Sequence, residues 1–487
     1  MPHHTARPPV KLAVEKLAAG GEGLARLNGE IILTPRALPG ELVSAVIGPA
    51  RKGVRRADVE KIILPSPLRT NPDCPLAASG RCDGCDFIHV RPEAALKLKS
   101  EAALGRLAET YGLETKLIES PLAAHYRHRL TLHLGLADGG LTAGFFDQRR
   151  QAAEFADCRL AAPALNRAAE ALRLWAAQLP QAMAGPEIHL ALGDDGAGLL
   201  AVFRPSPGRP AGAAGRSGRN RAAAEPALPH GLAREAEKLP AILAAHGFEA
   251  FGVFIQTRRH AAPRPLALTG QPGAENGRPL EGNSSLKLIR AAAWPELGLT
   301  LRAGPGVFTQ VNPAVNKLMV ELILELAAPL ASARAPSTPA RTRSRPARAL
   351  DLYCGLGNIS LPLAKKGFAV TGVESSADSL AAARLNAEGG AAFMRGDGAA
   401  LAAALVKQGQ SFDLIVLDPP RAGARDLAPH LAAMKPELIV YVACRPAALA
   451  RDLPAFVSLG YRPISLTALD MFPRTSHFET VAALVRA

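Results

Sequence analysis

The stretch ALDLYCGLGN, residues 349–358, joins an apolar run to a turn with two glycines, and it decides the fold class. Strand-like runs that alternate with helical segments are typical of βαβ units and a mostly parallel sheet. Ligands bind outside the carboxyl ends of the strands in such sheets. We therefore predict an α/β domain whose functional residues follow the ends of its strands. Four further apolar runs, with Ala- and Leu-rich segments between them, are FAVTGVE (368–374), DLIVLDPP (413–420), LIVYVAC (438–444) and TVAALVRA (480–487).

The composition is that of a globular chain. Its 487 residues suggest about two to four domains. Hydrophobic residues make up 48% of the chain, yet no apolar run is long enough to span a membrane, and the N-terminus MPHHTARPPVKL has no apolar segment of a secretory signal. Six cysteines are too few for a disulfide scaffold and indicate a reducing compartment. We therefore expect a soluble, multidomain, cytoplasmic protein without a membrane span.

The net charge of +14 fits a nucleic-acid-binding protein but does not establish one. Ten of the arginines lie in two stretches rich in Ala, Pro, Gly and Ser, residues 204–228 and 331–349. Such compositions bury too little apolar surface to fold, so both stretches are predicted to be low-complexity linkers, the first of them disordered. Solvated loops and basic arms for RNA remain alternative interpretations of them.

Residues 10–64 read as five short strands separated by turn residues such as Asn28-Gly29 and Pro39-Gly40. Five strands in so short a segment predict a small closed barrel of the OB type, which often binds nucleic acid. An SH3-like or purely structural barrel fits the same pattern. Farther along, the sequence predicts a helix over about residues 92–111 and strands at RLTLHLGL (129–136) and EIHLALG (187–193).

Acidic residues follow several of the apolar runs and are candidate cofactor ligands. Glu374 lies 19 residues after Gly355, where it would accept hydrogen bonds from ribose hydroxyls. NAD and S-adenosylmethionine (SAM) both contain such a ribose, and a surface turn residue is a further alternative for Glu374. Asp418, in Asp-Pro-Pro, favours a methyltransferase acting on planar bases or amides; its alternative is a bare proline-rich strand end. Asp397 lies where another strand is expected to end and could contact adenine.

Cys444 ends the run LIVYVAC and should face the same edge of the sheet as Asp418. A single cysteine at a strand end is more often a small buried residue than a nucleophile. The surrounding motifs change that balance, because five of them together resemble the RNA 5-methyluridine methyltransferases, the family of the tRNA and 23S rRNA uracil-C5 enzymes. The motifs are FTQVNP (308–313), DLYCGLGN (351–358), LDPPRAG (417–423), ACRPAALARDL (443–453) and HFETVAALVR (477–486).

The resemblance implies a domain organisation. Residues 10–70, with GEGLARL, ALPGELV and PSPLR, look like a TRAM domain, which implies an RNA-binding OB-like β-barrel over 1–68. A central α+β iron–sulfur domain is then expected over 69–300, and a Rossmann-like class I SAM methyltransferase domain over 301–487. The two linkers are longer than the family pattern requires.

The resemblance also implies a mechanism, in which Cys444 is the nucleophile and Glu479 the proton acceptor. Uracil C5 is a poor nucleophile, and addition of a thiolate at C6 makes C5 nucleophilic enough to take a methyl group. Since a free cysteine is mostly thiol at neutral pH, we expect local activation of Cys444. From the residues alone, the favoured interpretation of Glu479 is a solvated residue that opens the last strand. The positions that match the family's SAM site are Gln310, Tyr353, Asn358, Glu374, Asp397 and Asp418.

Four other cysteines form a candidate metal site: Cys74, Cys82, Cys85 and Cys158. The knuckle Cys82-Asp-Gly-Cys85 suits either tetrahedral zinc or an iron–sulfur cluster, and spacing alone does not choose between them. Resemblance to the TRAM-bearing rRNA enzymes implies a [4Fe–4S] cluster, with structural zinc as the alternative. The sequence departs from the family in three places. Seven residues separate Cys74 from Cys82 where five are usual, the knuckle is CDGC rather than CGGC, and Ala443 and Arg445 flank Cys444 where Ser and Asn are usual.

These observations predict SAM-dependent methylation of C5 of a uridine in structured RNA, with 23S rRNA as the expected partner and no obligate protein partner. A tRNA substrate is the first alternative, and a non-catalytic RNA-binding relative acting in ribosome assembly is the second. A methyltransferase of protein amides or small molecules would need neither Cys444 nor a barrel. A dehydrogenase explains neither Asp-Pro-Pro nor the pair Cys444 and Glu479.

Overall fold

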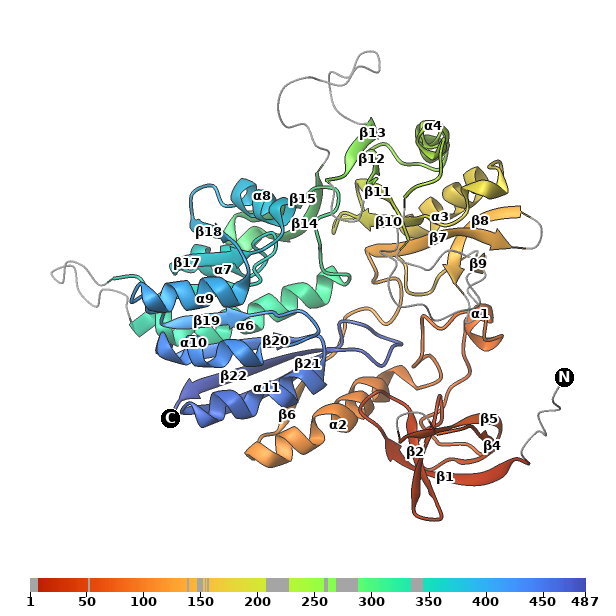
Figure 1. The fold of residues 1–487 in the computed structure, drawn as a ribbon, viewed down its shortest axis with the longest axis horizontal. Coiled ribbons are helices and arrows are strands. Elements are labelled where there is room, and N and C mark those ends of the chain that lie inside the picture. The colour runs from red at the N-terminus through yellow and green to blue at the C-terminus, as the bar shows by residue number, and fades with distance from the viewer. Residues whose placement is uncertain are drawn as a thin grey trace, which may run out of the picture.

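The structure, a computed structural model, has three parts along the chain: a barrel, a central region around a seven-stranded sheet, and a C-terminal domain around an eight-stranded sheet (Figure 1). No helix in the described part of the chain is long and apolar enough to cross a membrane. Most of the two predicted linkers, residues 207–226 and 334–344, lies outside the described residues. The structure describes residues 8–50, 53–137, 140–146, 152–153, 155, 157–206, 227–257, 262–268, 288–333 and 345–487.

The barrel confirms the prediction of five short strands. The strands follow the spatial order β1-β2-β3-β5-β4 and close on themselves. Alternate side chains of a strand point to opposite faces, and Leu12, Val14, Ile32 and Val43 meet in the core. Gly29 has a φ of 81°, which the tight turn between two strands requires. The strands are β1 (Val10–Leu17), β2 (Gly23–Leu27), β3 (Glu30–Thr34), β4 (Leu42–Ile47) and β5 (Arg55–Leu64).

A buried carboxylate fastens the barrel to the segment that leaves it. Glu41 is only 1% exposed. It accepts hydrogen bonds from Arg69 at 2.5 and 2.8 Å. The backbone N–H groups of Leu38 and Ser66 also donate to it, at 2.8 and 3.1 Å. All of the carboxylate's bonds thus converge on the junction between the barrel and the rest of the chain.

The chain then forms the short helix α1 (Pro75–Ala78) and the long helix α2 (Pro92–Tyr111). Helix α2 matches the predicted range: Pro92 lies in its first turn, and Gly112 ends it with a φ of 62°. Its buried face packs on the C-terminal domain, where Leu96 and Leu104 join that domain's core. The following strand, β6 (Thr115–Ile118), is an edge strand of the C-terminal sheet.

The central region is a sheet in the order β13-β12-β11-β10-β7-β8-β9. Both predicted strands are present, as β7 and β10, and they pair antiparallel. Helix α3 covers one face, and Trp175 from it packs edge-to-face on Phe203 of β11. The elements are β7 (Arg129–Ala137), β8 (Gly140–Phe146), β9 (Ala152–Ala153), α3 (Pro163–Ala176), β10 (Glu187–Leu192), β11 (Leu199–Arg204), α4 (Leu232–Ala236), α5 (Leu239–Ala245), β12 (Phe251–Ile255) and β13 (Arg264–Leu268).

The C-terminal sheet has the order β18-β17-β16-β19-β20-β22-β21-β6. Its first five strands are parallel neighbours, which confirms the Rossmann-like α/β prediction. Strand β22 runs antiparallel to both of its neighbours, a reversal that the sequence did not indicate. The strands are β16 (Arg348–Leu352), β17 (Ala369–Glu374), β18 (Ala391–Arg395), β19 (Leu414–Leu417), β20 (Leu438–Ala443), β21 (Tyr461–Leu469) and β22 (Glu479–Arg486).

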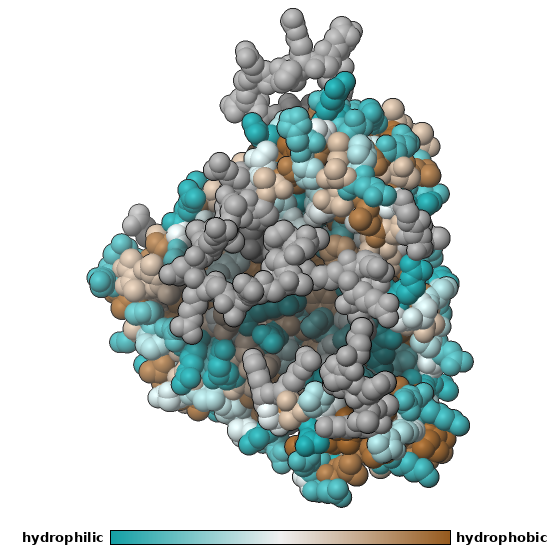
Figure 2. All heavy atoms as spheres, turned by 45° about the vertical axis from the view of Figure 1, so that its right-hand side comes forward, coloured by the Kyte–Doolittle hydropathy of each residue, from teal (hydrophilic) through white to brown (hydrophobic). Residues whose placement is uncertain are grey.

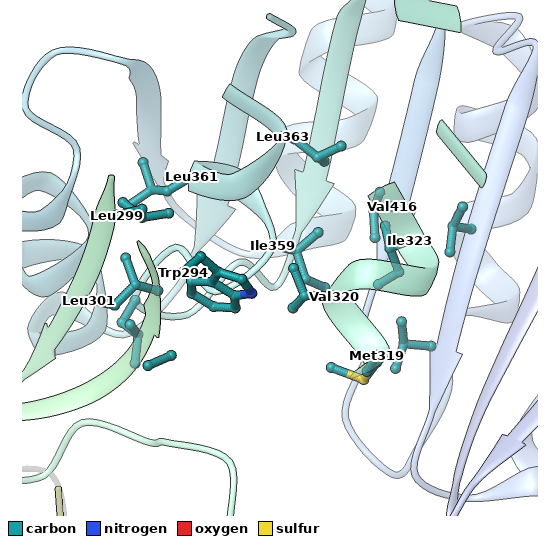
Figure 3. Close-up of a cluster of buried hydrophobic side chains, with 14 of the residues drawn as sticks. Trp294, Leu299, Leu301, Met319, Val320, Ile323, Ile359, Leu361, Leu363 and Val416 are labelled. Carbon is teal, nitrogen blue, oxygen red and sulfur yellow. The ribbon is translucent and has the colours of Figure 1, made fainter. Parts of the chain in front are cut away.

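A separate hairpin, β14 (Ile289–Trp294) and β15 (Leu299–Ala303), packs with helix α6 (Pro313–Ala333) against this sheet. Figure 3 shows Trp294 and Leu299 of the hairpin in the same apolar cluster as Met319 of α6 and Val416 of β19. This cluster fixes the segment 304–312, which leads from the hairpin to α6, over the carboxyl edge of the sheet. The other helices are α7 (Ser360–Lys365), α8 (Ala377–Asn386), α9 (Gly398–Lys407), α10 (Ala428–Ala433) and α11 (Pro446–Ser458).

Replacing Glu41 by Gln should loosen the barrel junction. The change leaves the Arg69 guanidinium without its buried counter-charge, and breaking a buried ion pair costs about 3–5 kcal/mol. Hydrogen exchange of peptides from the barrel at pH 7 measures the loss as faster exchange. The matched control is Glu15→Gln, since Glu15 forms an exposed pair with Arg26 at 3.5 Å. Equal exchange in both variants would contradict the role given to Glu41.

The junction should also weaken in acid. Burial alone would raise the pKa of Glu41, but Arg69 and the N–H groups of Leu38 and Ser66 lower it overall. A carboxyl with a lowered pKa stabilises the fold above its unfolded pKa, and that stability is lost as the pH falls through the folded value. The Glu41→Gln variant should lack this part of the pH dependence.

Candidate active site

The carboxyl end of β16 forms the floor of a pocket. The chain turns there through Tyr353, Gly355 and Gly357, whose φ angles are 67°, 57° and 93°. At a φ of 93°, Gly357 has a backbone conformation that other residues rarely adopt, and an added Cβ would also lie 2.9 Å from the Leu361 side chain. Asn358 follows, and its amide exchanges two hydrogen bonds, of 2.9 and 2.8 Å, with Asn316 of α6. These two hydrogen bonds tie the motif DLYCGLGN to the first turn of α6.

Four of the six predicted SAM ligands line this pocket together: Gln310, Tyr353, Asn358 and Asp418. They come from three places, which are the segment before α6, the turn after β16 and the end of β19. The parallel register of β16 and β19 brings Leu352 beside Leu417, so that Tyr353 and Asp418 follow at the same edge. The pocket therefore has the position that ligands take in parallel sheets.

The other two predicted ligands lie around the pocket and already have local partners. Glu374 accepts hydrogen bonds from the backbone N–H groups of Gly355 at 3.1 Å and Ser376 at 2.7 Å. Asp397 caps helix α9, where its carboxylate accepts two backbone N–H bonds of 3.0 Å. Burial raises the pKa of the Tyr353 phenol, and the negative charge of Asp397 raises it further. Both acids thus border the turn that forms the floor of the pocket.

Sequence reasoning missed Asp351, which also lines the pocket. It is fully buried, and Ser360 donates a hydrogen bond of 2.5 Å to one carboxylate oxygen. The other oxygen has no hydrogen-bond partner within the described residues. Burial raises the pKa of Asp351 to about 7. The signal available in the sequence was a charged residue inside an apolar strand. The unpaired oxygen of Asp351 can accept a hydrogen bond from a ligand that carries a positively charged donor.

The pair Cys444 and Glu479 is brought together by strand register. Ala443 of β20 lies opposite Thr480 of β22. Because these strands are antiparallel, Cys444 leaves the sheet where Glu479 enters it, and the two predicted catalytic residues meet at one edge. Glu479 is 5% exposed, so the alternative of a solvated residue is wrong. One of its carboxylate oxygens has no hydrogen-bond partner among the described residues.

Electrostatics link Cys444, Glu479 and Asp418. Burial raises the pKa of the Cys444 thiol, and the negative charges of Glu479 and Asp418 raise it further, while Arg421 lowers it. Burial and the neighbouring Asp418 raise the pKa of Glu479 well above its usual range. The expectation of a locally activated thiol is therefore wrong for the free protein, because burial and two neighbouring carboxyl groups disfavour the thiolate.

The four candidate metal ligands line one cavity. Cys74, Cys82, Cys85 and Cys158 border a space of about 310 Å³. Burial raises the pKa of Cys85 to about 12, and the other three thiols add to the rise. The N–H of Gly84 points at the Cys82 sulfur, at 3.4 Å. Within the described residues no three metal-binding side chains lie at the spacing of a single ion.

The fold and pocket define the class, a SAM-dependent methyltransferase, and residues 349–426 match the family model described as "Methyltransferase domain". The chain is 32% identical to the 23S rRNA (uracil(1939)-C(5))-methyltransferase RlmD of Alkalilimnicola ehrlichii, over 99% of this chain and 97% of that protein. The protein of the same name from Shewanella sp. is also 32% identical, over 96% of this chain and 94% of its own.

The chain therefore belongs to the family of 23S rRNA uracil-C5 methyltransferases, and it is a SAM-dependent RNA uracil-C5 methyltransferase. The fold agrees. The crystal structure of Pyrococcus abyssi tRNA (uracil-54, C5)-methyltransferase with S-adenosyl-L-homocysteine superimposes with a TM-score of 0.63 and 22% identity, covering 98% of this chain and all of that one (100%).

The charges around Cys444 predict opposite effects of two substitutions on its alkylation by iodoacetamide. Glu479→Gln removes the negative charge that Glu479 carries once its carboxyl has lost its proton, so at pH 9 it should lower the thiol pKa and speed alkylation about two- to tenfold, since one pKa unit corresponds to about tenfold. Arg421→Gln removes the positive charge and should slow it. Mass spectrometry of the Cys444 peptide gives both rates. Changes in the same direction would contradict the electrostatic linkage.

Proposed function

We propose that this protein methylates C5 of the 23S rRNA uridine that its relatives' names give as position 1939. The observation that carries the proposal is the pairing of Cys444 with Glu479 beside the pocket of Asp418. Similarity over nearly the full length of the named relatives supports the substrate. Such a substrate also supports a cytoplasmic location.

In the proposed mechanism, Cys444 and Glu479 first lose their protons to solvent. The Cys444 thiolate then forms a bond to C6 of the uracil, and the C5–C6 double-bond electrons move into the ring carbonyl as an enolate. SAM, when bound, would supply an electrophilic methyl group, which C5 takes as the methyl–sulfur bond breaks and S-adenosyl-L-homocysteine leaves. The Glu479 carboxylate then removes the C5 proton, the electrons of that C–H bond restore the C5–C6 double bond, and the thiolate leaves. Cys444 thus adds to the uracil ring and later leaves it, and Glu479 accepts the proton from C5.

For SAM we propose the residues at the pocket and its border. Gln310, Tyr353, Asn358 and Asp418 line the pocket. Glu374, beside the glycine turn, suits the ribose hydroxyls, as acids at this strand end do in nucleotide-binding sheets. Asp397, beside Tyr353, is proposed to lie near the adenine.

An RNA substrate also requires an accessible polar surface and an unstacked base. Figure 2 shows a hollow near the centre of one face, with hydrophilic residues around it. C5 and C6 of a stacked base are hard to reach, so the target uridine should be flipped out or lie in an unpaired loop. The OB-like barrel at the N-terminus supports binding of a structured RNA.

We further propose that Cys74, Cys82, Cys85 and Cys158 hold a structural [4Fe–4S] cluster. Four soft thiol ligands around one cavity fit such a cluster. The long gap after Cys74 fits as well, because helix α1 (Pro75–Ala78) takes up four of its residues. Structural zinc is the second candidate, since it takes the same donor set.

The function can be tested with labelled SAM and two RNAs. Unmodified 23S rRNA should gain 5-methyluridine at the proposed position, and bulk tRNA should gain none. Cys444→Ala should reduce the transfer at least about a thousandfold, because covalent activation of C5 is lost. Titration with SAM serves as the control, since the variant should still bind it. Label in tRNA would contradict the proposed substrate, and an active Cys444→Ala would contradict the mechanism.

The metal content tests the cluster. Protein purified without oxygen should contain iron and acid-labile sulfide in equal amounts, about four of each per chain. Cys82→Ser should lower both, while Cys354→Ser, in a buried cysteine that does not line the cavity, should leave both unchanged. Zinc without sulfide would establish the alternative.

A further inference from the structure

The loop from Asp470 to Phe478 joins β21 to β22, and Glu479 is the residue that follows it. The loop has no regular secondary structure, so its course depends on what holds it from outside. Strand pairing fixes the backbone of Glu479 opposite Leu469. One of its carboxylate oxygens has no hydrogen-bond partner within the described residues, so the direction of the side chain depends on the loop beside it.

A buried lysine of helix α2 holds both ends of this loop. Lys99 is 2% exposed, and its ammonium donates to the Asp470 carboxylate at 2.6 Å. It also donates to the backbone carbonyls of Thr475 at 3.1 Å and His477 at 2.8 Å. A longer contact of 3.4 Å reaches the Phe472 carbonyl, so four acceptors of the loop share the three donors of the ammonium. His477 lies two residues before Glu479, so this contact reaches the base almost directly.

The segment around the cysteine knuckle holds the middle of the loop. Asp86 follows Cys85 directly, and its carboxylate accepts from the Ser476 backbone N–H at 2.8 Å and from the Ser476 hydroxyl at 2.5 Å. The N–H of Phe87 donates to the carbonyl of Arg474 at 3.1 Å. The Arg474 side chain pairs with Asp73, which precedes Cys74.

Helix α2 does not need the Lys99 ammonium in order to pack on the C-terminal domain. Apolar side chains of α2, such as Leu96 and Leu104, already pack in the core of the C-terminal domain. A buried ammonium carries a desolvation cost that an apolar side chain avoids. The contribution of Lys99 is to hold the backbone carbonyls of Thr475 and His477, and so to fix the course of the loop.

We propose that Lys99 and Asp86 are positioning residues that hold the loop so that the Glu479 carboxylate reaches the C5 proton of the methylated uracil. The proposal rests on the role of Glu479 proposed above. A displacement of about 1 Å in a catalytic group can cost about a hundredfold in rate. The residues should therefore act on one step, in which Glu479 takes the proton, the C5–C6 double bond re-forms and the Cys444 thiolate leaves.

The test separates that step from the earlier ones in a single turnover. An rRNA fragment with tritium at C5 of the target uridine and SAM with a carbon-14 methyl group report methyl transfer as carbon-14 in RNA and proton removal as tritium in water. Denaturing gels report the covalent enzyme–RNA adduct. The variants are Lys99→Met, Asp86→Ala and Glu479→Gln, with Lys97→Met as the matched control. Lys97 lies on the same helix and is 70% exposed in its side chain.

We expect Lys99→Met and Asp86→Ala to form the adduct and transfer the methyl group within about threefold of wild type. Tritium release should be slower by about tenfold to a hundredfold, because general base catalysis contributes about 10²–10⁴-fold. The methylated adduct should accumulate, as in Glu479→Gln, and Lys97→Met should behave as wild type.

Equal slowing of all three readouts in both variants would make the residues merely structural and overturn the proposal. Normal tritium release in Asp86→Ala would overturn the role of Asp86, and this variant decides the matter if Lys99→Met does not fold. Failure of Glu479→Gln to accumulate the methylated adduct would instead contradict the base assigned under the proposed function.

Discussion

The antiparallel pairing of β22 with β20 is the constraint on which the active site depends. Parallel strands all end at one edge of a sheet, and a strand that runs the other way begins there. Glu479 therefore meets Cys444 although 34 residues separate them. A register slip of one residue would turn the side chain to the other face of the sheet. The observed register places Ala443 opposite Thr480 in two strands that are buried on both faces.

The same edge of the sheet concentrates carboxyl groups. Burial raises the pKa values of Asp418, Glu479 and Asp351, and one carboxylate oxygen each of Glu479 and Asp351 has no hydrogen-bond partner within the described residues. Such a site favours a cationic ligand, and the sulfonium of SAM is cationic. It also disfavours the Cys444 thiolate in the free protein.

Local patterns in the sequence predicted much of this arrangement. Strand alternation and turn glycines gave the barrel, and apolar runs gave the parallel strands, because both signals lie within a few neighbouring residues. The reversal of β22 carries no such signal, and neither does the ion pair of Lys99 with Asp470, whose partners lie 371 residues apart. The low pKa expected for Cys444 was wrong for a related reason: it depends on carboxylates that only the fold assembles.

The loop before Glu479 is also where the parts of the chain meet. A Cβ added at Gly21, in the barrel, would lie 2.8 Å from both Phe87 and Ser476, so the barrel turn touches the loop and the knuckle together. Helix α2 reaches the loop through Lys99, and the central region reaches it through Tyr126, whose hydroxyl donates to the Pro473 carbonyl at 2.9 Å. RNA bound across the barrel and the central region, as the proposed function requires, would act on elements that contact this loop. The C-terminal domain alone lacks these contacts, so the N-terminal parts brace the loop that leads to Glu479.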